Sequence, residues 1–315
     1  MDFTVIICTY NRSDNLPECL KALEDQQDVE ELDWEVLVVD NNSTDNTKEV
    51  VENYAHKSII KIRYAHEKQQ GLNYARNLGM REEKGDYFSY VDDDILVNKV
   101  WLRSIYDAFI ENNADAVGGR IHLDESITLP KWVLPELYGF LGYQDLGETS
   151  FQMDGKKNYP FGGNMAFSRK IAKKVGLFNP RLGRKGEGKT RNELFKGAET
   201  DYFHRLSDIE KHRIFYAPDA IVYHQIKDFQ LEKKYFRTIH FNAGFQKALF
   251  DDPSYNRVIA GIPLFLYSQF FRNAGKYLAQ VMKNGPDKAF RQQMTAGNFL
   301  GMILGYHKKY KDQKH

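Results

Sequence analysis

Three consecutive aspartates stand where a buried strand is expected to end. The stretch FSYVDDDILV, residues 88–97, places Asp92, Asp93 and Asp94 directly after an apolar, β-prone run. Carboxylates this close repel one another, so one should take up a proton unless a cation or a ligand balances the charge. An Asp-x-Asp at a strand end suits Mg²⁺ or Mn²⁺, which bind one or two carboxylates together with phosphate oxygens and water. The residues therefore point to metal-assisted chemistry on a diphosphate.

Alternating strands and helices are expected to position these aspartates. Continuous apolar runs predict strands, and the 3.6-residue apolar periodicity between them predicts helices. The expected strands are 3–8, 34–40, 59–66 and 86–92, and expected helices include 47–55 and 72–83. This alternation predicts an α/β fold whose mostly parallel sheet is covered by helices and binds ligands beyond the carboxyl ends of its strands.

The pattern is less regular after about residue 115. Residues 114–123 predict another strand, and residues 212–226 predict two paired short strands ending at His224. In RLGRKGEGK, residues 181–189, glycines alternate with basic residues, which suits either a solvated connector or a lid over phosphate. Beyond residue 228 the chain reads as helices rich in aromatic and basic residues, a composition typical of a helical cap or of helices at a membrane surface.

The composition narrows the classes of partner and compartment. Lys and Arg number 44 against 43 Asp and Glu, so the net charge of +1 gives no reason to expect nucleic acid. Cys8 and Cys19 have neither the spacing of a metal site nor that of a disulfide framework, and we expect buried thiols. We expect no signal peptide, because no basic segment and apolar core precede the first strand. These features predict a cytoplasmic protein.

Six stretches, taken in order, resemble the inverting family 2 glycosyltransferases with the GT-A fold. They are TVIICTYNRSDNLPECLKAL, VLVVDNNSTDNT, GLNYARNLG, YVDDDI, FGGNMAFSR and GAETDYFHRL, spread over roughly residues 3–228. The resemblance implies a nucleotide-diphosphate sugar as donor, a Mn²⁺ or Mg²⁺ ion, and inversion at the anomeric carbon. It further implies a hydroxyl of a glycan or lipid-linked glycan as acceptor, in cell-surface polysaccharide synthesis.

The resemblance also implies roles for individual residues. The nucleotide-sugar site would consist of Thr9, Tyr10, Arg12, Asp40, Arg76, Asp92, Asp93 and Asn164, and the metal site of Asp94 and His224. In the family the loop after the first strand and the acid matching Asp40 contact the base, and the position of Asp92 faces the ribose. The position of Asn164 lines the sugar and acceptor site. From the residues alone, His224 could equally be a packed structural histidine.

The catalytic base is where this sequence departs from the family pattern. Relatives usually carry a Glu-Asp pair before Thr-Asp or Thr-Glu, whereas this chain has Ala198-Glu199 before Thr200-Asp201. Glu199 occupies the position of the base, and Asp201 is the second candidate for removing the proton of the acceptor hydroxyl. An acidic residue that merely complements the positive end of a helix is the structural alternative for Glu199.

The resemblance divides the chain into functional parts and leaves two rivals. Residues 1–228 would form the GT-A domain, with a nucleotide-binding half at 1–115 and an acceptor half at 116–228. Residues 229–315 would form a helical extension in peripheral contact with the inner face of the cell membrane. One rival is a sugar nucleotidyltransferase, although CTYNRSDN lacks the glycines of a phosphate loop. The other is a non-catalytic nucleotide-binding subunit, which the Ala198-Glu199 change would suit.

Overall fold

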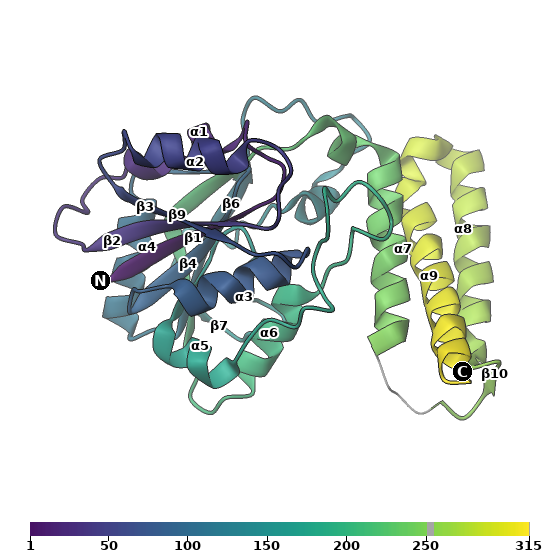
Figure 1. Cartoon of the computed structure of the whole chain (residues 1–315). Coiled ribbons are helices and arrows are strands. Elements are labelled where there is room, and N and C mark those ends of the chain that lie inside the picture. Colours follow the sequence, from purple (N-terminus) through teal and green to yellow (C-terminus); the bar gives the residue numbers. More distant parts are fainter. Residues whose placement is uncertain (251–254, 315) are drawn as a thin grey trace. The chain divides into compact units, whose positions relative to one another are not determined.

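The computed structural model describes residues 1–250 and 255–314. Contacts between residues divide this part of the chain into two compact units. The α/β unit contains residues 1–128, 136–187 and 197–226, and the helical unit contains residues 129–135, residues 188–196 and the described residues from 227 onward. Figure 1 colours both units along the sequence. The functional boundary at residue 228 remains a prediction.

The described residues of the α/β unit form a nine-stranded sheet. Its strands are β1 (Phe3–Thr9), β2 (Trp34–Asp40), β3 (Lys61–His66), β4 (Tyr87–Asp92), β5 (Ile95–Val97), β6 (Ala116–Leu123), β7 (Phe151–Met153), β8 (Met165–Ser168) and β9 (Ile214–His224). The order is β3-β2-β1-β4-β8-β6-β9-β5, and β7 pairs with β9. The first four strands and the β6–β9 pair are parallel, whereas β5, β7 and β8 pair antiparallel. The predicted mostly parallel sheet is confirmed.

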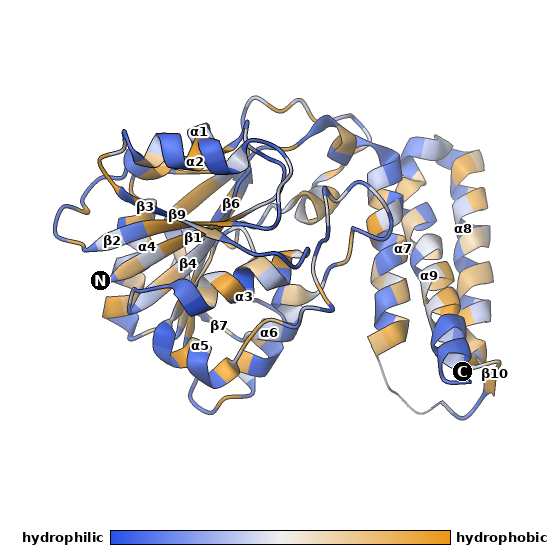
Figure 2. Cartoon of the chain, in the orientation of Figure 1, coloured by the Kyte–Doolittle hydropathy of each residue, from blue (hydrophilic) through white to orange (hydrophobic). Residues whose placement is uncertain are grey.

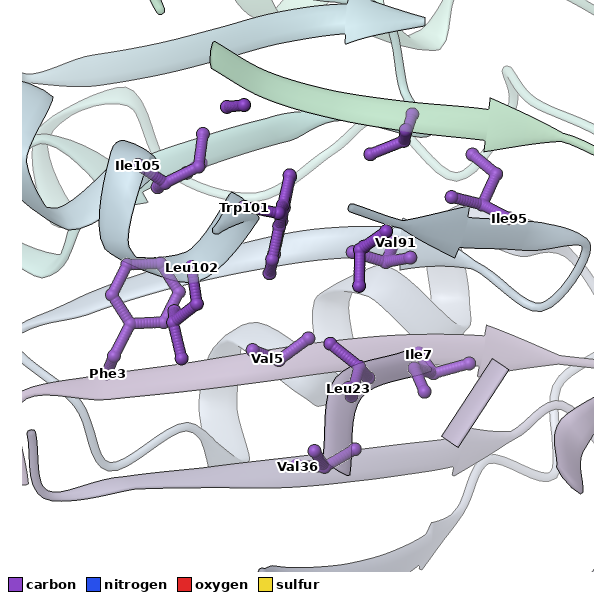
Figure 3. Close-up of a cluster of buried hydrophobic side chains, with 14 of the residues drawn as sticks. Phe3, Val5, Ile7, Leu23, Val36, Val91, Ile95, Trp101, Leu102 and Ile105 are labelled. Atoms are coloured by element: carbon purple, nitrogen blue, oxygen red, sulfur yellow. The ribbon is translucent and has the colours of Figure 1, made fainter. Parts of the chain in front are cut away.

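Helices cover both faces of this sheet, as a parallel sheet requires. They are α1 (Leu16–Glu24), α2 (Thr47–Ala55), α3 (Leu72–Glu82), α4 (Trp101–Asn112), α5 (Arg169–Val175) and α6 (Ala198–Ser207), and a 3-10 helix, η1, spans Pro135–Leu141. Val5 and Ile7 of β1 pack in one core with α1 and α4, including Trp101 (Figure 3). Ile6 points to the other core, with α3, α5 and α6. Alternate residues of one strand thus anchor opposite layers.

The region 212–226 differs from its sequence prediction. It forms one strand, β9 (Ile214–His224), and not two paired short strands. Its pairing with β6 shifts register between Gly119, which faces Ala217, and Arg120, which faces Ile221. Pro218 lies in this shift, and a proline has no N–H to donate to a sheet ladder. The shift is a bulge within a single strand and does not divide the region into two strands.

The described part of the helical unit contains three long helices. Its elements are η2 (Asp228–Leu231), α7 (Lys233–Phe250), β10 (Val258–Ile259), β11 (Ile262–Pro263), α8 (Leu264–Lys288) and α9 (Phe290–Asp312). Gly285 interrupts the last turns of α8 with a φ of 82°. Buried residues of α7, β11, α8 and α9 form the core of this unit. None of the described helices is long and apolar enough to cross a membrane.

Far from the aspartates, a buried ion pair joins the amino ends of β2 and β3. The carboxylate of Glu35 is fully buried and accepts from Arg63 Nε at 2.9 Å and Nη2 at 2.6 Å. Lys61 Nζ lies 3.4 Å from Glu35 Oε2. Although burial by itself raises the pKa of Glu35, the hydrogen bond and charge of Arg63, with help from Lys61, hold the pKa below its usual value.

A lowered pKa makes this contribution to stability pH-dependent. The stabilisation is complete above the unfolded-state pKa of about 4 and is lost as the pH falls through the lower folded-state pKa. We expect Glu35→Gln to reduce the free energy of unfolding by about 2–3 kcal/mol at neutral pH. The gap from the wild type should shrink below about pH 4 in urea titrations. Glu30→Gln, at an exposed position, is the matched control. An equal gap at low pH would contradict this account.

Candidate active site

Three adjacent parallel strands bring the predicted nucleotide residues to one edge of the sheet. Thr9, Asp40 and Asp92 are the last residues of β1, β2 and β4. The register pairs Thr9 with Asp40 and Cys8 with Asp92, so the three strand ends lie side by side. Tyr10, partly exposed, follows at the start of the loop after β1. This edge is where α/β sheets bind ligands.

Asp40 is held by two partners. Its Oδ2 accepts from the Tyr64 hydroxyl at 2.7 Å, and its Oδ1 accepts from the backbone N–H of Ser43 at 2.9 Å. The loop after β2 is joined to the loop after β1 through Asn11, whose Oδ1 accepts from the backbone N–H of Thr44 at 2.7 Å. The two loops after β1 and β2 therefore form one connected rim, and Asn11 is part of it.

Asp93 and Asp94 share one arginine. Arg12 Nη1 lies 2.6 Å from Asp94 Oδ2 and 3.4 Å from Asp93 Oδ1. The Thr9 hydroxyl donates to Asp93 Oδ2 at 2.7 Å. His224 Nε2 lies 3.4 Å from the remaining oxygen, Asp94 Oδ1. Protein cations thus answer the charge problem posed by the sequence: Arg12 and His224 balance Asp94, and Arg12 also serves Asp93.

The three carboxyl groups consequently differ in acidity. Burial raises the pKa of Asp93 to about 7, because Arg12 and Thr9 offset only part of its effect. Burial also acts on Asp94, but His224 and Arg12 outweigh it and hold the pKa below its usual range. For Asp92, burial and then the charge of Asp94 raise the pKa. Asp94 is therefore the most acidic of the three and is ionised at neutral pH.

The basic loop seen in the sequence supplies another positive charge. Arg184 lowers the pKa of both Asp92 and Asp94, so its guanidinium lies near them. The loop is tied to the start of α3, where Arg184 O accepts from the Leu72 N–H at 2.9 Å and Gln70 Oε1 accepts from the Gly186 N–H at 2.9 Å. The alternation of glycine and basic residues was the signal in the sequence, but it did not single out Arg184.

The buried Arg76 forms an ion pair with Glu199, whose side chain is 26% exposed. Arg76 Nη1 donates to Glu199 Oε1 at 2.9 Å, and Arg76 is 1% exposed. The guanidinium lies over the rings of Phe178 and Tyr90, 5.4 and 5.9 Å from their centroids. Glu199 stands in the first turn of α6, which begins after Gly197 in a left-handed conformation, φ 93°. The structure thus joins the predicted nucleotide arginine directly to the predicted base.

Asp201 is not brought to this pair. Residues two positions apart on a helix are rotated by about 200°, so Glu199 and Asp201 point to nearly opposite sides of α6. Asp201 instead lies 3.0 Å from Arg205 Nη2, and Arg205 also donates to the carbonyls of Val175 and Leu177. The Arg205 side chain therefore joins α6 to the end of α5.

Asn164 occupies a structural position. It is fully buried, and its Oδ1 accepts from the indole N–H of Trp101 at 2.9 Å. Its Nδ2 donates to the carbonyls of Arg120 and Ala220, each at 2.9 Å. These hydrogen bonds tie α4 to β6 and β9, and the position of Asn164 beside the sugar and acceptor remains a prediction.

The donor atoms around Asp94 fit a divalent cation. A carbonyl oxygen only accepts, so His224 Nδ1, 2.7 Å from Leu141 O, carries a proton, and Nε2, which faces Asp94, would give up its own proton to bind a metal ion. Carboxylate oxygen and imidazole nitrogen both bind Mn²⁺, and a backbone carbonyl on the other nitrogen is the usual support for a ligating histidine. Within the described residues no three His, Cys, Asp or Glu side chains are grouped to hold a metal. Phosphate oxygens and water would complete the coordination.

A cavity of about 610 Å³ lies elsewhere on the α/β unit. It is lined by His66, Glu67, Lys68, Gln69, Tyr74, Asn77, Arg81, Leu177, Phe178 and Pro180. None of the residues predicted for the donor or metal site contributes to its wall. We therefore place the candidate site at the strand ends, where the charged side chains converge, and not in this cavity.

Comparison with known proteins decides the family. The model for "Glycosyl transferase family 2" matches residues 4–176, more than half of the chain. The chain belongs to this family. Among its family 2 relatives, the glucosyl-dolichyl phosphate glucuronosyltransferase of Haloferax volcanii is 25% identical over 286 residues, 90% of this chain and 83% of that protein. Glycosyltransferase AglE of the same organism is 27% identical over 281 residues, which are 89% of this chain and 84% of AglE.

Solved structures agree with the fold of this family 2 chain. One is the mannosyltransferase PcManGT from Pyrobaculum calidifontis in complex with GDP-Man and Mn²⁺, which has a TM-score of 0.59 at 18% identity. The match covers 99% of this chain and 87% of the PcManGT chain. S. aureus TarS 1–349 in complex with UDP-GlcNAc has a TM-score of 0.53 at 18% identity. The match covers 100% of this chain and 92% of the TarS chain. The predicted family and GT-A fold are confirmed.

Gly162 offers a test of the Arg76–Glu199 pair, and sequence reasoning did not single it out. A Cβ at Gly162 would overlap both Glu199 Oε1 and Arg76 Nη2. Because these are the ends of flexible side chains, Gly162→Ala should move the pair with little loss of stability. We expect kcat for sugar transfer to fall about 100-fold, the usual result of a displacement of about 1 Å at a reacting group.

The matched control for this variant is Gly139→Ala, whose added Cβ would meet nothing within 4 Å. It should keep wild-type kcat and melting temperature. Wild-type kcat in Gly162→Ala would mean that the position of the pair does not matter for transfer.

Proposed function

We propose that this glycosyltransferase moves a sugar from a nucleotide diphosphate to a hydroxyl of a glycan or lipid-linked glycan, with inversion, in cell-surface polysaccharide synthesis. The observation that carries the proposal is the convergence of Asp94 and His224 with Arg76 and Glu199 in one unit of the chain. The first pair suits a metal–diphosphate, and the second suits an acceptor hydroxyl. A nucleotide site without a base would need only the first.

The first half of the site would hold the nucleotide. Asp40 has the acceptor oxygens for a base N–H, and Thr9 and Tyr10 line the adjacent rim. Asp92 would accept from ribose hydroxyls. Arg12 has a flexible, permanently charged side chain that can exchange its contact with Asp94 for a phosphate oxygen. Asp93, bonded to Thr9 and Arg12, would keep these two side chains in place.

The second half of the site would perform the displacement. Glu199 accepts the proton of the acceptor hydroxyl while that oxygen forms a bond to the anomeric carbon and the bond from carbon to the diphosphate oxygen breaks. Arg76 orients the Glu199 carboxylate through the 2.9 Å hydrogen bond. Asp94 and His224 would hold Mn²⁺ or Mg²⁺, which when bound stabilises the negative charge of the departing diphosphate.

Relatives support the donor and acceptor classes. PcManGT and TarS were solved with GDP-Man and UDP-GlcNAc, and PcManGT also with Mn²⁺. The Haloferax volcanii relative is named for a dolichyl phosphate-linked sugar. A lipid-linked acceptor of that kind is presented at a membrane, so we infer that this enzyme works in the cytoplasm at the inner membrane face. Its functional division would be the one expected from the sequence, with residues 229–315 as the membrane-contacting extension.

Nucleotide binding is the first property to measure. In a thermal-shift series with UDP, GDP, CMP and dTDP, each with and without Mn²⁺, one nucleoside diphosphate should raise the melting temperature by several degrees in a metal-dependent way. At about 100 times the dissociation constant, ligand binding stabilises by about 2.7 kcal/mol. Asp94→Ala should abolish the metal-dependent part. No shift with any nucleotide would sink the donor assignment.

The assignment of the base rests on Glu199 and has a built-in control. Glu199→Gln should lower kcat by about 10²–10⁴-fold, because the acceptor hydroxyl loses its general base. The melting-temperature shift by the nucleotide should persist. Asp201→Asn, two residues along the same helix, should stay within a few-fold of wild type. The reverse pattern would move the base to Asp201, and nucleotide binding without any turnover in the wild type would favour a non-catalytic subunit.

A further inference from the structure

Helix α8 (Leu264–Lys288) buries little of its surface. Leu266 and Asn273 are its buried residues. They are seven positions apart and therefore share one face of the helix. Leu266 packs in the core of the helical unit, and Asn273 Oδ1 accepts from Gln292 Nε2 of α9 at 2.6 Å. This face fixes α8 to its unit. The opposite face of α8 contains no buried residue.

The opposite face of α8 carries a row of exposed apolar side chains. Leu264, Phe271, Leu278 and Met282 are 37%, 68%, 60% and 84% exposed. Their spacing of seven, seven and four residues places them in one line, about half a turn from Leu266 and Asn273. We call these four residues the α8 stripe. Figure 2 shows hydrophobic segments along α8 amid hydrophilic ones. Contiguous exposed apolar surface of this kind marks an interaction site.

A basic row runs beside the α8 stripe. Arg272, Lys276 and Lys283 are exposed and share a face of the helix about a quarter turn from the stripe. The sequence from 264 to 286 contains no aspartate or glutamate. The helix therefore presents apolar side chains flanked by positive charges that no acidic residue within 264–286 balances, the arrangement of helices that lie in the plane of a membrane interface.

We propose that the α8 stripe inserts into the surface of an anionic phospholipid bilayer, with the basic row at the level of the lipid phosphates. The inference rests on the proposed function, because a lipid-linked acceptor would be met at such a surface. Insertion is shallow, since no described helix is long and apolar enough to cross. A symmetric contact between two copies would place the two basic rows side by side and repel, whereas anionic lipid attracts both.

Vesicle flotation of the full-length protein tests the proposal. Wild type should float with phosphatidylcholine vesicles that contain phosphatidylglycerol and bind much less to phosphatidylcholine alone. The double variant Leu278→Glu with Met282→Glu should lose binding by about tenfold or more. Lys276→Gln with Lys283→Gln should lose about tenfold on anionic vesicles only. The control is Ile59→Glu, in the α/β unit, where Ile59 is 87% exposed. Absence of wild-type binding, or an equal loss in Ile59→Glu, overturns the proposal.

Two further measurements separate the other outcomes. Sedimentation equilibrium without lipid should show a monomer; a dimer that Leu278→Glu with Met282→Glu dissociates would assign the stripe to a second copy and overturn the lipid proposal. Thermal shifts with the nucleoside diphosphate should be unchanged in the α8 variants. Lipid binding without any nucleotide binding in the wild type would reject the proposed function but uphold the α8 stripe, whereas nucleotide binding without lipid binding would do the reverse.

Discussion

The gathering of Asp92, Asp93 and Asp94 at one strand end is the constraint on which the rest of the site depends. Buried carboxylates repel and are poorly solvated, so the fold tolerates them only where positive charge is brought close. Here that charge comes from Arg12 after β1, His224 at the end of β9 and the basic loop around Arg184. Three segments far apart in the sequence are thus held together by one electrostatic requirement.

The same requirement explains why the site can accept a ligand. A carboxylate balanced by the flexible side chain of an arginine can exchange that contact for a metal ion that carries its own phosphate oxygens. Arg12 approaches Asp94 with a single nitrogen and keeps the freedom of a long side chain. His224, fixed through Leu141, stays in place beside Asp94. One partner can leave while the other remains as a ligand.

The ion pair of Arg76 and Glu199 is the second organising contact, and its surroundings show how closely it is built. Arg76 lies against aromatic rings with 1% exposure, and Gly162 leaves just enough space for both charged ends. The ion pair joins α3, in the first half of the α/β unit, to α6, in the second half. The residues expected at the nucleotide and at the acceptor are therefore coupled mechanically, through a single hydrogen bond.

The sequence by itself determined the strand–helix alternation, the parallel sheet and the edge at which Thr9, Asp40 and Asp92 meet, because periodicity and strand direction are local properties of the chain. Only the tertiary structure decided what each polar side chain faces. Asn164 is bonded to the indole of Trp101 and to two backbone carbonyls, and Asp201 is paired with Arg205, because the nearby backbone carbonyls and the rotation along the helix, not residue type, select hydrogen-bond partners.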